Sequence, residues 1–220
     1  MSPLRPSVAG ATIEAQSIRR FCDVVFGYVG GLVPVRLLPE AGTPEQKPRL
    51  DFPDAVTVAD RLIGIAGWAA EQQRGVFVVP GTVERPGSAR AADIVQTGVL
   101  VIDLDHGDIC SKSAHLARYL GPASLQVASG GITDDGQAKL HLYWRLSEAA
   151  VGEDAVRVAE LRGALAARVG GDPAFKSLHQ PIRVAGTIHG KNGRRTSVRI
   201  LSDGQSEYHL CELAERIADM

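Results

Sequence analysis

The sequence predicts an α+β fold in which a mixed or antiparallel sheet carries helices on one face and leaves the other face open. Helical and strand-like periodicities both occur along the 220 residues. Strands predicted at 124–128 and 139–146 lie next to each other in the chain, separated by Gly130-Gly131 and a polar segment. Parallel neighbours would need a crossover helix between them. This order therefore favours an α+β sheet over a doubly wound parallel one.

The first 75 residues are expected to form an N-terminal helical or α/β portion that packs on the rest. Residues 13–26 have helical spacing, and residues 32–38 are rich in branched side chains. Pro34 makes an edge strand the natural assignment for that second segment, because proline cannot donate to a central ladder. Residues 39–53 are interpreted as a loop, and residues 55–73 as a second helix.

Residues 76–220 are expected to form the core, and the two portions together one compact domain. Strands are predicted at 76–80, 99–105, 124–128, 139–146, 182–185 and 197–201. Helices are predicted at 112–119, 153–169 and 207–218, with Gly170-Gly171 ending the second of them.

Composition limits the function classes that fit. A formal net charge of -1 means that any contact with nucleic acid must come from a local basic patch. The three cysteines are far apart and form no CxxC pair, so no zinc site or disulfide framework is predicted. No apolar run reaches the roughly 20 residues that cross a bilayer. We expect a cytoplasmic protein without a membrane association.

The segment VLVIDLD at 99–105 places two carboxylates on one face of a strand. Asp103 and Asp105 are two residues apart, so their side chains project from the same face at a spacing of about 7 Å. Such neighbours repel unless a cation lies between them, and carboxylates are ligands for hard divalent ions. The pair therefore predicts magnesium or manganese, although it could also end a buried strand and cap the next helix.

The segment KLHLYWRL at 139–146 alternates unusually cleanly between apolar and polar residues. Its apolar residues share one face, while Lys139, His141, Tyr143 and Arg145 share the other. If this strand joins the sheet of Asp103, the polar face lies beside the carboxylates and would suit a nucleoside triphosphate. A structural histidine and a solvated cationic face remain the alternative.

A third segment, from Gly170 to Arg195, combines Asp172 with several cations. Arg183 and Lys191 can neutralise phosphate, and glycines at 186, 190 and 193 allow close backbone approach. Arg194 and Arg195 are interpreted as solvated residues of a hairpin turn.

Together, VIDLD, then SGG with LHLYW, then an aspartate followed by RVAGTIHGK resemble the primase-polymerase domains of plasmid and phage replication proteins, including RepB-like primases, of the archaeo-eukaryotic primase superfamily. The resemblance covers about residues 76–199. It implies an RRM-like catalytic sheet and a DNA primase or primase-polymerase activity that makes or extends primers by a two-metal mechanism. This sequence departs from the family pattern at Ala185, at His189 and in the insert ITDDGQA.

The resemblance also assigns roles to individual residues. Asp103, Asp105 and Asp172 would be catalytic and bind two Mg²⁺ or Mn²⁺ ions. His141 would contact the incoming triphosphate and Arg183 or Lys191 its outer phosphates, with Ser129 and Lys139 also in the nucleotide site. The partners would be a single-stranded DNA template and nucleoside triphosphates. A helicase would be a further partner, although its GxxxxGK[ST] motif is not present in this chain.

Two other function classes stay open. A non-catalytic module that binds single-stranded nucleic acid or an origin would use the same cations, but would need stacking aromatics, and aromatic residues make up 5% of the chain. A DxD phosphohydrolase or glycosyltransferase would explain Asp103 and Asp105 but not the His141 strand. A rolling-circle nuclease is disfavoured because the sequence contains no HxH pair.

Overall fold

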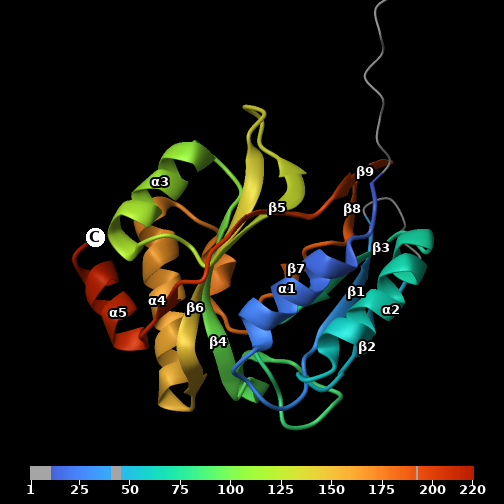
Figure 1. Cartoon of the computed structure of the whole chain (residues 1–220), viewed down its shortest axis with the longest axis horizontal. Coiled ribbons are helices and arrows are strands. Elements are labelled where there is room, and N and C mark those ends of the chain that lie inside the picture. The colour runs from blue at the N-terminus through green and yellow to red at the C-terminus, as the bar shows by residue number, and fades with distance from the viewer. Residues whose placement is uncertain (1–10, 41–45, 192) are drawn as a thin grey trace, which may run out of the picture.

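Two β-sheets and a separate hairpin organise the computed structural model, which describes residues 11–40, 46–191 and 193–220. The α+β prediction is confirmed (Figure 1). The described residues form five α-helices and two short 3-10 helices: α1 Ala15–Phe26, α2 Val58–Glu71, α3 Ile109–Leu120, α4 Glu153–Val169, α5 Leu210–Ala218, η1 Ala91–Asp93 and η2 Pro173–Lys176.

The central sheet contains the two strands that the sequence singled out. It consists of β4 Gln96–Leu104, β5 Leu125–Ile132, β6 Ala138–Val151, β10 Arg199–Asp203 and β11 Glu207–Tyr208. The long strand β6 pairs antiparallel with β4 along one edge and with β5 along the other. β10 continues the antiparallel pattern beyond β5, while the short β11 pairs parallel to β6. The short segment 133–137 between β5 and β6 thus joins antiparallel neighbours, as predicted.

A second, smaller sheet lies in the N-terminal part of the fold. Its strands are β1 Val35–Pro39, β2 Arg49–Asp51, β3 Arg74–Val78 and β7 Ile182–Arg183, in the order β2-β1-β3-β7. β1 and β2 come from the first 75 residues, β3 crosses that boundary and β7 lies beyond it, so this sheet joins both parts of the chain. The division into 1–75 and 76–220 stays a prediction.

Two expectations for this sheet are wrong. β1 is not an edge strand, since it pairs with β2 on one side and β3 on the other. Pro34 precedes the strand, so it does not remove a ladder donor, and Pro39 is its last residue. The segment 39–53, interpreted as a loop, contains β2, whose short and exposed sequence gave no strand periodicity.

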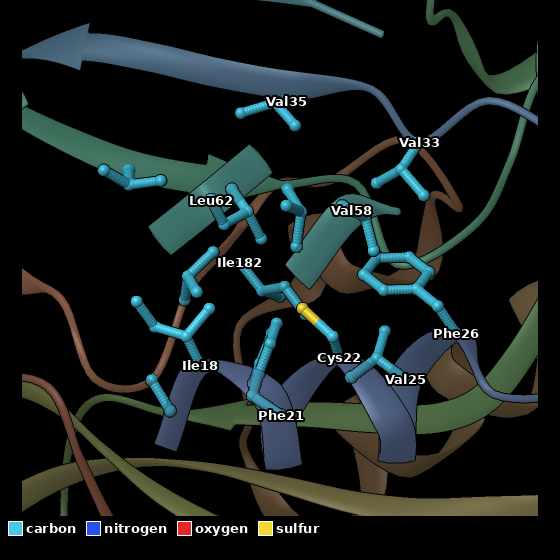
Figure 2. Packing of buried hydrophobic residues seen from close by; sticks show 14 of the residues in the cluster. Ile18, Phe21, Cys22, Val25, Phe26, Val33, Val35, Val58, Leu62 and Ile182 are labelled. Carbon is cyan, nitrogen blue, oxygen red and sulfur yellow. The ribbon is translucent and has the colours of Figure 1, made fainter. Parts of the chain in front are cut away.

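Alternation along the central strands separates two hydrophobic cores. Leu140, Leu142, Trp144 and Leu146 of β6 pack with α3, α4 and α5, as predicted. The opposite face contributes Val99, Val101, Val127 and Tyr143 to a core with α1, α2 and the N-terminal sheet. Figure 2 shows this second core, with Phe21, Cys22 and Val25 of α1 directed toward Val35 and Leu62.

The expectation of one open sheet face is therefore wrong over most of its area. Tyr143, predicted on the open face, is fully buried and meets Phe21 edge-to-face with ring centroids 5.8 Å apart. The sequence could not reveal this, because an aromatic on a polar-looking face fits either water or a second layer. The polar end of that face, around Asp103, Asp105 and Lys139, is only partly covered.

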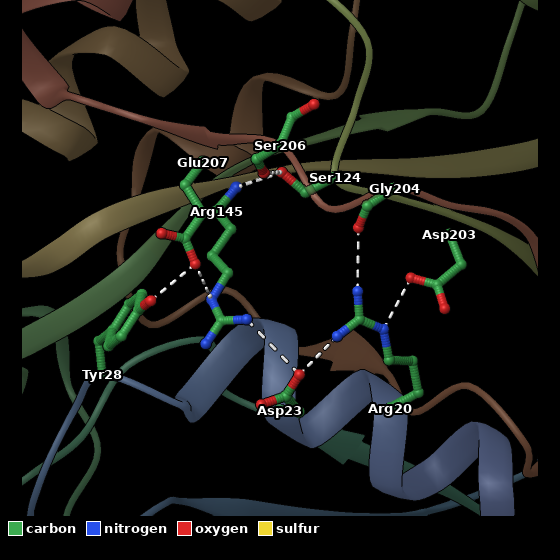
Figure 3. Close-up of polar contacts among 9 residues, drawn as sticks. All are labelled: Arg20, Asp23, Tyr28, Ser124, Arg145, Asp203, Gly204, Ser206 and Glu207. Atoms are coloured by element: carbon green, nitrogen blue, oxygen red, sulfur yellow. Dashed lines mark hydrogen bonds and ion pairs between the residues drawn. The ribbon is translucent and has the colours of Figure 1, made fainter.

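An ion-pair network fastens α1 to the central sheet (Figure 3). Arg145 of β6 lies 3.5 Å from Asp23 of α1 and 3.4 Å from Glu207, and its guanidinium stacks on Tyr28 at 4.4 Å from the ring centroid. Arg20 joins Asp23 to Asp203. Arg145 thus has a structural role away from Asp103, which the strand alternation alone did not show.

Among the helices of the described ranges, none is both long enough and apolar enough to span a bilayer.

Candidate active site

The register between β4 and β6 brings the predicted carboxylates and the predicted histidine together. Asp103 is the direct cross-strand partner of His141, and its Oδ1 lies 3.6 Å from His141 Nε2. Asp105, just after β4, lies 3.9 Å from Lys139 Nζ through its Oδ2. Since Lys139 and His141 are alternate residues of β6, both aspartates project from the same face, as the strand pattern predicted.

The Asp103 carboxylate is largely withdrawn from water. Only 17% of its side-chain surface is exposed, and among the described residues its Oδ1 atom is buried without a hydrogen-bond donor. A buried carboxylate oxygen without a donor is costly, so such an atom favours binding of a cation or a ligand. The chemistry and position of Asp103 therefore fit a divalent ion.

The His141 ring is held by contacts on the side away from Asp103, which leave its Nε2 directed toward that carboxylate. Its Nδ1 lies 3.3 Å from the Tyr143 hydroxyl, and the Phe175 ring of η2 lies against it at 6.0 Å between centroids. Burial raises the pKa of Tyr143 well above its usual value, and the nearby Asp103 charge acts in the same direction. Tyr143 is therefore a neutral support for His141 and not a stacking surface for a base.

The backbone of Asp172 is hydrogen-bonded to that of Asp103, but the Asp172 carboxylate accepts a hydrogen bond from a different residue. Its amide donates to the Asp103 carbonyl at 3.1 Å. Its Oδ1 accepts from the amide of Ala174 at 2.8 Å and so caps η2. Within residues 11–40, 46–191 and 193–220, no group of three or more histidine, cysteine or acidic side chains is placed to hold a metal ion.

Lys139, the cation that contacts Asp105, also lines a cavity of about 500 Å³. The cavity is bounded by the Gly-rich end of β5, the start of β6 and the hairpin of β8 Ile188–Lys191 and β9 Arg194–Ser197. Its lining consists mainly of small, polar and basic residues: Ser129, Gly130, Gly131, Ile132, Lys139, His189, Lys191, Arg194 and Thr196. Ser129, Lys139 and Lys191 were predicted in a nucleotide site, and the fold brings them together.

Gly130 is required where the hairpin approaches β5. Its φ is +86°, a region that L side chains rarely adopt, and a Cβ atom there would lie 2.6 Å from His189 Cβ. The same Cβ would lie 2.8 Å from Thr196 Oγ1, whose hydroxyl donates to the Gly130 carbonyl at 2.9 Å. This close approach forms one wall of the cavity.

Arg183 lines a neighbouring cavity of about 320 Å³ that shares His189 and Lys191 with the first. Its guanidinium stacks on Phe77 at 4.3 Å from the ring centroid. Burial lowers the pKa of Arg183 to about 10, against the opposing influence of Glu40 and Asp103. The arginine stays charged near neutral pH and lies within electrostatic reach of Asp103.

His189 lines both cavities, although no role was predicted for it. Its Nδ1 lies 3.0 Å from the Ser129 carbonyl. Burial lowers the pKa of His189, and the positive charges of Arg183, Lys191 and Lys139 act in the same direction. The signal that could have found it is its place two residues before Lys191, on the same face of a strand.

Arg194, interpreted as a solvated turn residue, also lines the larger cavity, whereas Arg195 donates to the Ala70 carbonyl at 2.8 Å and so contacts the end of α2. Cross-strand pairing in the hairpin places Arg194 opposite Lys191. Turn composition alone could not distinguish these two arginines.

Solved structures of primases have the same fold as this chain. The AEP domain of the cyanophage S-2L primase-polymerase (PrimPol) superposes with a TM-score of 0.69 and 18% sequence identity, over 94% of this chain and 99% of that one. Primase RepB′ gives a TM-score of 0.64 and 14% identity, over 93% of this chain and 63% of that one. The catalytic domain of RepB′ in complex with initiator DNA gives 0.60 and 15%, over 93% and 95%.

No protein-family model and no curated protein sequence matches the chain. The structural likeness confirms, at the level of the fold, the resemblance to primase-polymerase domains that the motifs indicated.

Proposed function

We propose that this protein is a template-directed nucleotidyltransferase that makes or extends primers on single-stranded DNA during replication of a plasmid, phage or other mobile element. The observation that carries the proposal is the Asp103 carboxylate, whose buried Oδ1 has no hydrogen-bond donor among the described residues, together with a basic cavity whose Lys139 contacts the neighbouring Asp105. The likeness to the folds of primases adds support.

Two Mg²⁺ or Mn²⁺ ions are expected to bind at the carboxylates. Asp103 and Asp105 would hold both ions, and Asp172 would be the third ligand if its carboxylate released the Ala174 amide that it now accepts from. Such ions lower the pKa of an attacking 3′-hydroxyl and neutralise the charge on the triphosphate and the leaving pyrophosphate. Removal of the ions with a chelator should therefore stop synthesis.

The basic cavity is the proposed site of the triphosphate. Lys139 and Lys191 would neutralise phosphate oxygens, while Arg183, close enough to Asp103 to interact electrostatically, would bind the outer phosphates. His141, fixed by Tyr143, would donate from Nε2 to a phosphate oxygen, since its Nδ1 already meets the tyrosine hydroxyl. Ser129 holds the wall of the cavity through the contact between its carbonyl and His189.

The DNA template would contact the protein through local positive charge, because the net charge of -1 attracts no polyanion as a whole. One of the similar structures is a primase domain in complex with initiator DNA. A helicase outside this chain is a further proposed partner in replication.

The proposal is tested by incubating the protein with single-stranded template, labelled nucleotides and Mg²⁺ or Mn²⁺, with and without a primer. Product without primer indicates a primase, and extension alone indicates a polymerase. Asp103→Ala with Asp105→Ala should abolish both while the circular dichroism spectrum stays unchanged. The matched control removes two exposed carboxylates from the turn between β5 and β6, Asp134→Ala with Asp135→Ala, and should stay active.

Three outcomes would contradict the proposal. Full activity in the Asp103 and Asp105 double variant would exclude the metal assignment. DNA binding without product under any metal condition would favour a recognition module, and release of phosphate without strand synthesis would favour a hydrolase.

A further inference from the structure

Lys112, in the first turn of α3, bridges two of the segments that carry the carboxylates. Its Nζ donates to the His106 carbonyl at 2.9 Å and to the Gly170 carbonyl at 2.6 Å. His106 directly follows Asp105, and Gly170 precedes Asp172 by two residues. A single ammonium group therefore ties together two chain segments that lie far apart in the sequence.

The surroundings are shaped to admit this side chain. Gly107 and Gly170 have φ values of +67° and +64°. A Cβ atom would lie 3.4 Å from Lys112 Nζ at Gly107 and 3.3 Å from it at Gly170. Glycine at both positions permits the backbone turns that direct the two carbonyls at the lysine. The Asp108 side chain caps α3 through the Ser111 amide at 3.1 Å and so fixes the helix that carries Lys112.

Two further contacts connect this bridge to the three aspartates, one through the backbone and one through a side chain. The Asp172 amide donates to the Asp103 carbonyl at 3.1 Å, so the third aspartate is linked to the first through the backbone. His106 Nδ1 lies 2.6 Å from Asp105 Oδ1, so the residue whose carbonyl Lys112 holds also contacts the second carboxylate. Loss of the bridge would free both segments at once.

We infer that Lys112 is a positioning residue that sets the separation of Asp105 and Asp172 and thereby prepares the carboxylates for divalent ions. This inference rests on the proposed function. Groups that hold metal ligands from behind contribute strongly to affinity, and their loss typically weakens metal binding about 10- to 100-fold. Lys112 lines neither the basic cavity nor the neighbouring cavity of Arg183, so replacing it should have little effect on nucleotide binding.

The test compares Lys112→Met, which keeps the aliphatic stem, with Lys112→Arg, which can still donate to two carbonyls. Binding of Mn²⁺ is followed by electron paramagnetic resonance of the free ion, without nucleotide or DNA. Lys112→Met should bind Mn²⁺ about 10- to 100-fold more weakly, and Lys112→Arg should restore most of the affinity. In primer extension, kcat should fall in Lys112→Met while the KM for nucleotide stays near that of the wild type.

Arg118→Met is the matched control, because Arg118 is an exposed cation of the same helix that bridges no pair of carbonyls in the described structure. It should leave Mn²⁺ binding unchanged. If Lys112 only caps the end of α4, Lys112→Met will lower the melting temperature but bind Mn²⁺ like the wild type, and the inference is overturned.

Amide hydrogen exchange separates this inference from the proposed function. Lys112→Met should accelerate exchange in both 104–108 and 170–173, whereas acceleration in 170–173 alone would contradict a bridge. If the wild type binds no Mn²⁺ and makes no product, the proposed function fails, and with it the metal role of Lys112, while exchange still decides whether the bridge exists.

Discussion

Arg162 of α4 should lower the stability of the protein, and its replacement by methionine should raise it. The side chain is fully buried, and among the described residues its Nε and Nη1 atoms have no hydrogen-bond partner. Its Nη2 donates to the Val99 carbonyl at 3.0 Å and lies 3.4 Å from the hydroxyl oxygen of Thr97 on β4. A buried cation so sparsely bonded is expensive.

The pKa of Arg162 gives the magnitude. Burial lowers the pKa of this guanidinium from its usual value to about 9. At about 1.36 kcal/mol per pKa unit, this shift corresponds to roughly 5 kcal/mol of destabilisation. Methionine removes the charge but also the shorter hydrogen bond to the buried Val99 carbonyl, which keeps only the Thr97 hydroxyl at 3.4 Å as a donor. That loss costs about 1–3 kcal/mol. The net gain for Arg162→Met is about 2–4 kcal/mol, or a melting temperature at least about 4 °C higher for a chain of this size.

Urea denaturation at pH 7 and pH 10 tests this reasoning. Below pH 9, both folded and unfolded states hold the proton, so the wild type carries the full penalty. Above about pH 9 the folded state loses this proton while the unfolded state keeps it, so the wild type gains stability as the pH rises to 10 and its difference in stability from Arg162→Met narrows. The control Arg157→Met, an exposed arginine of α4, should change stability by less than about 0.5 kcal/mol. An Arg162→Met protein less stable than the wild type at both pH values would refute the reasoning.

Three further predictions concern the candidate site. Gly130→Ala should lower the free energy of unfolding, measured by urea denaturation, by at least about 1 kcal/mol, and it should raise the KM for nucleotide. The control Gly136→Ala has a φ of +80° but nothing within 4 Å of the new Cβ, so it should lower the free energy of unfolding through backbone strain alone and leave the KM unchanged. Burial and neighbouring cations lower the pKa of His189, and a bound phosphate should favour its protonated form. Nucleotide affinity, measured by calorimetry, should therefore rise more in the wild type than in His189→Asn as the pH falls from about 8 toward 6. Mn²⁺ at 100 times its Kd should stabilise the wild type by about 2.7 kcal/mol, or about 5–10 °C in a thermal melt, but leave Asp103→Asn unchanged.

Much of the fold could be predicted because it depends on local patterns. The alternation of 139–146 identified the face that packs on α3, α4 and α5, and Gly170 ends α4 in the left-handed conformation as expected. The second layer could not be predicted in this way. Tyr143 has the same alternation whether it faces water or α1, and only the packing of α1 against the central sheet decides between them.

Arg162 shows the same limit on a helix. The helical pattern of 153–169 counted apolar positions, yet Val156 is 58% exposed and Arg162 is buried. The reason lies in another element, because the Arg162 guanidinium donates to the Val99 carbonyl of β4. Periodicity describes one element at a time and does not reveal a contact with a backbone carbonyl of a neighbouring strand.

The candidate site divides along the same line. Asp103, Asp105, His141 and Lys139 could be predicted together, because two alternating strands in one sheet must place them on one face. His189 and Arg194 could not, since they reach the cavity through a hairpin that packs against Gly130 from a distant part of the chain.

The burial that contradicts the expected open face also explains where the site lies. Because α1 and the N-terminal sheet cover the middle of the polar-looking face, the candidate site lies at its end, where β4 stops after Leu104 and β6 begins. Asp103 lies at the edge of this cover, buried enough to lack a donor for Oδ1 and still 17% exposed. A carboxylate in that position is poorly solvated without a cation, so the layer that hides Tyr143 is what makes Asp103 suited to a metal ion.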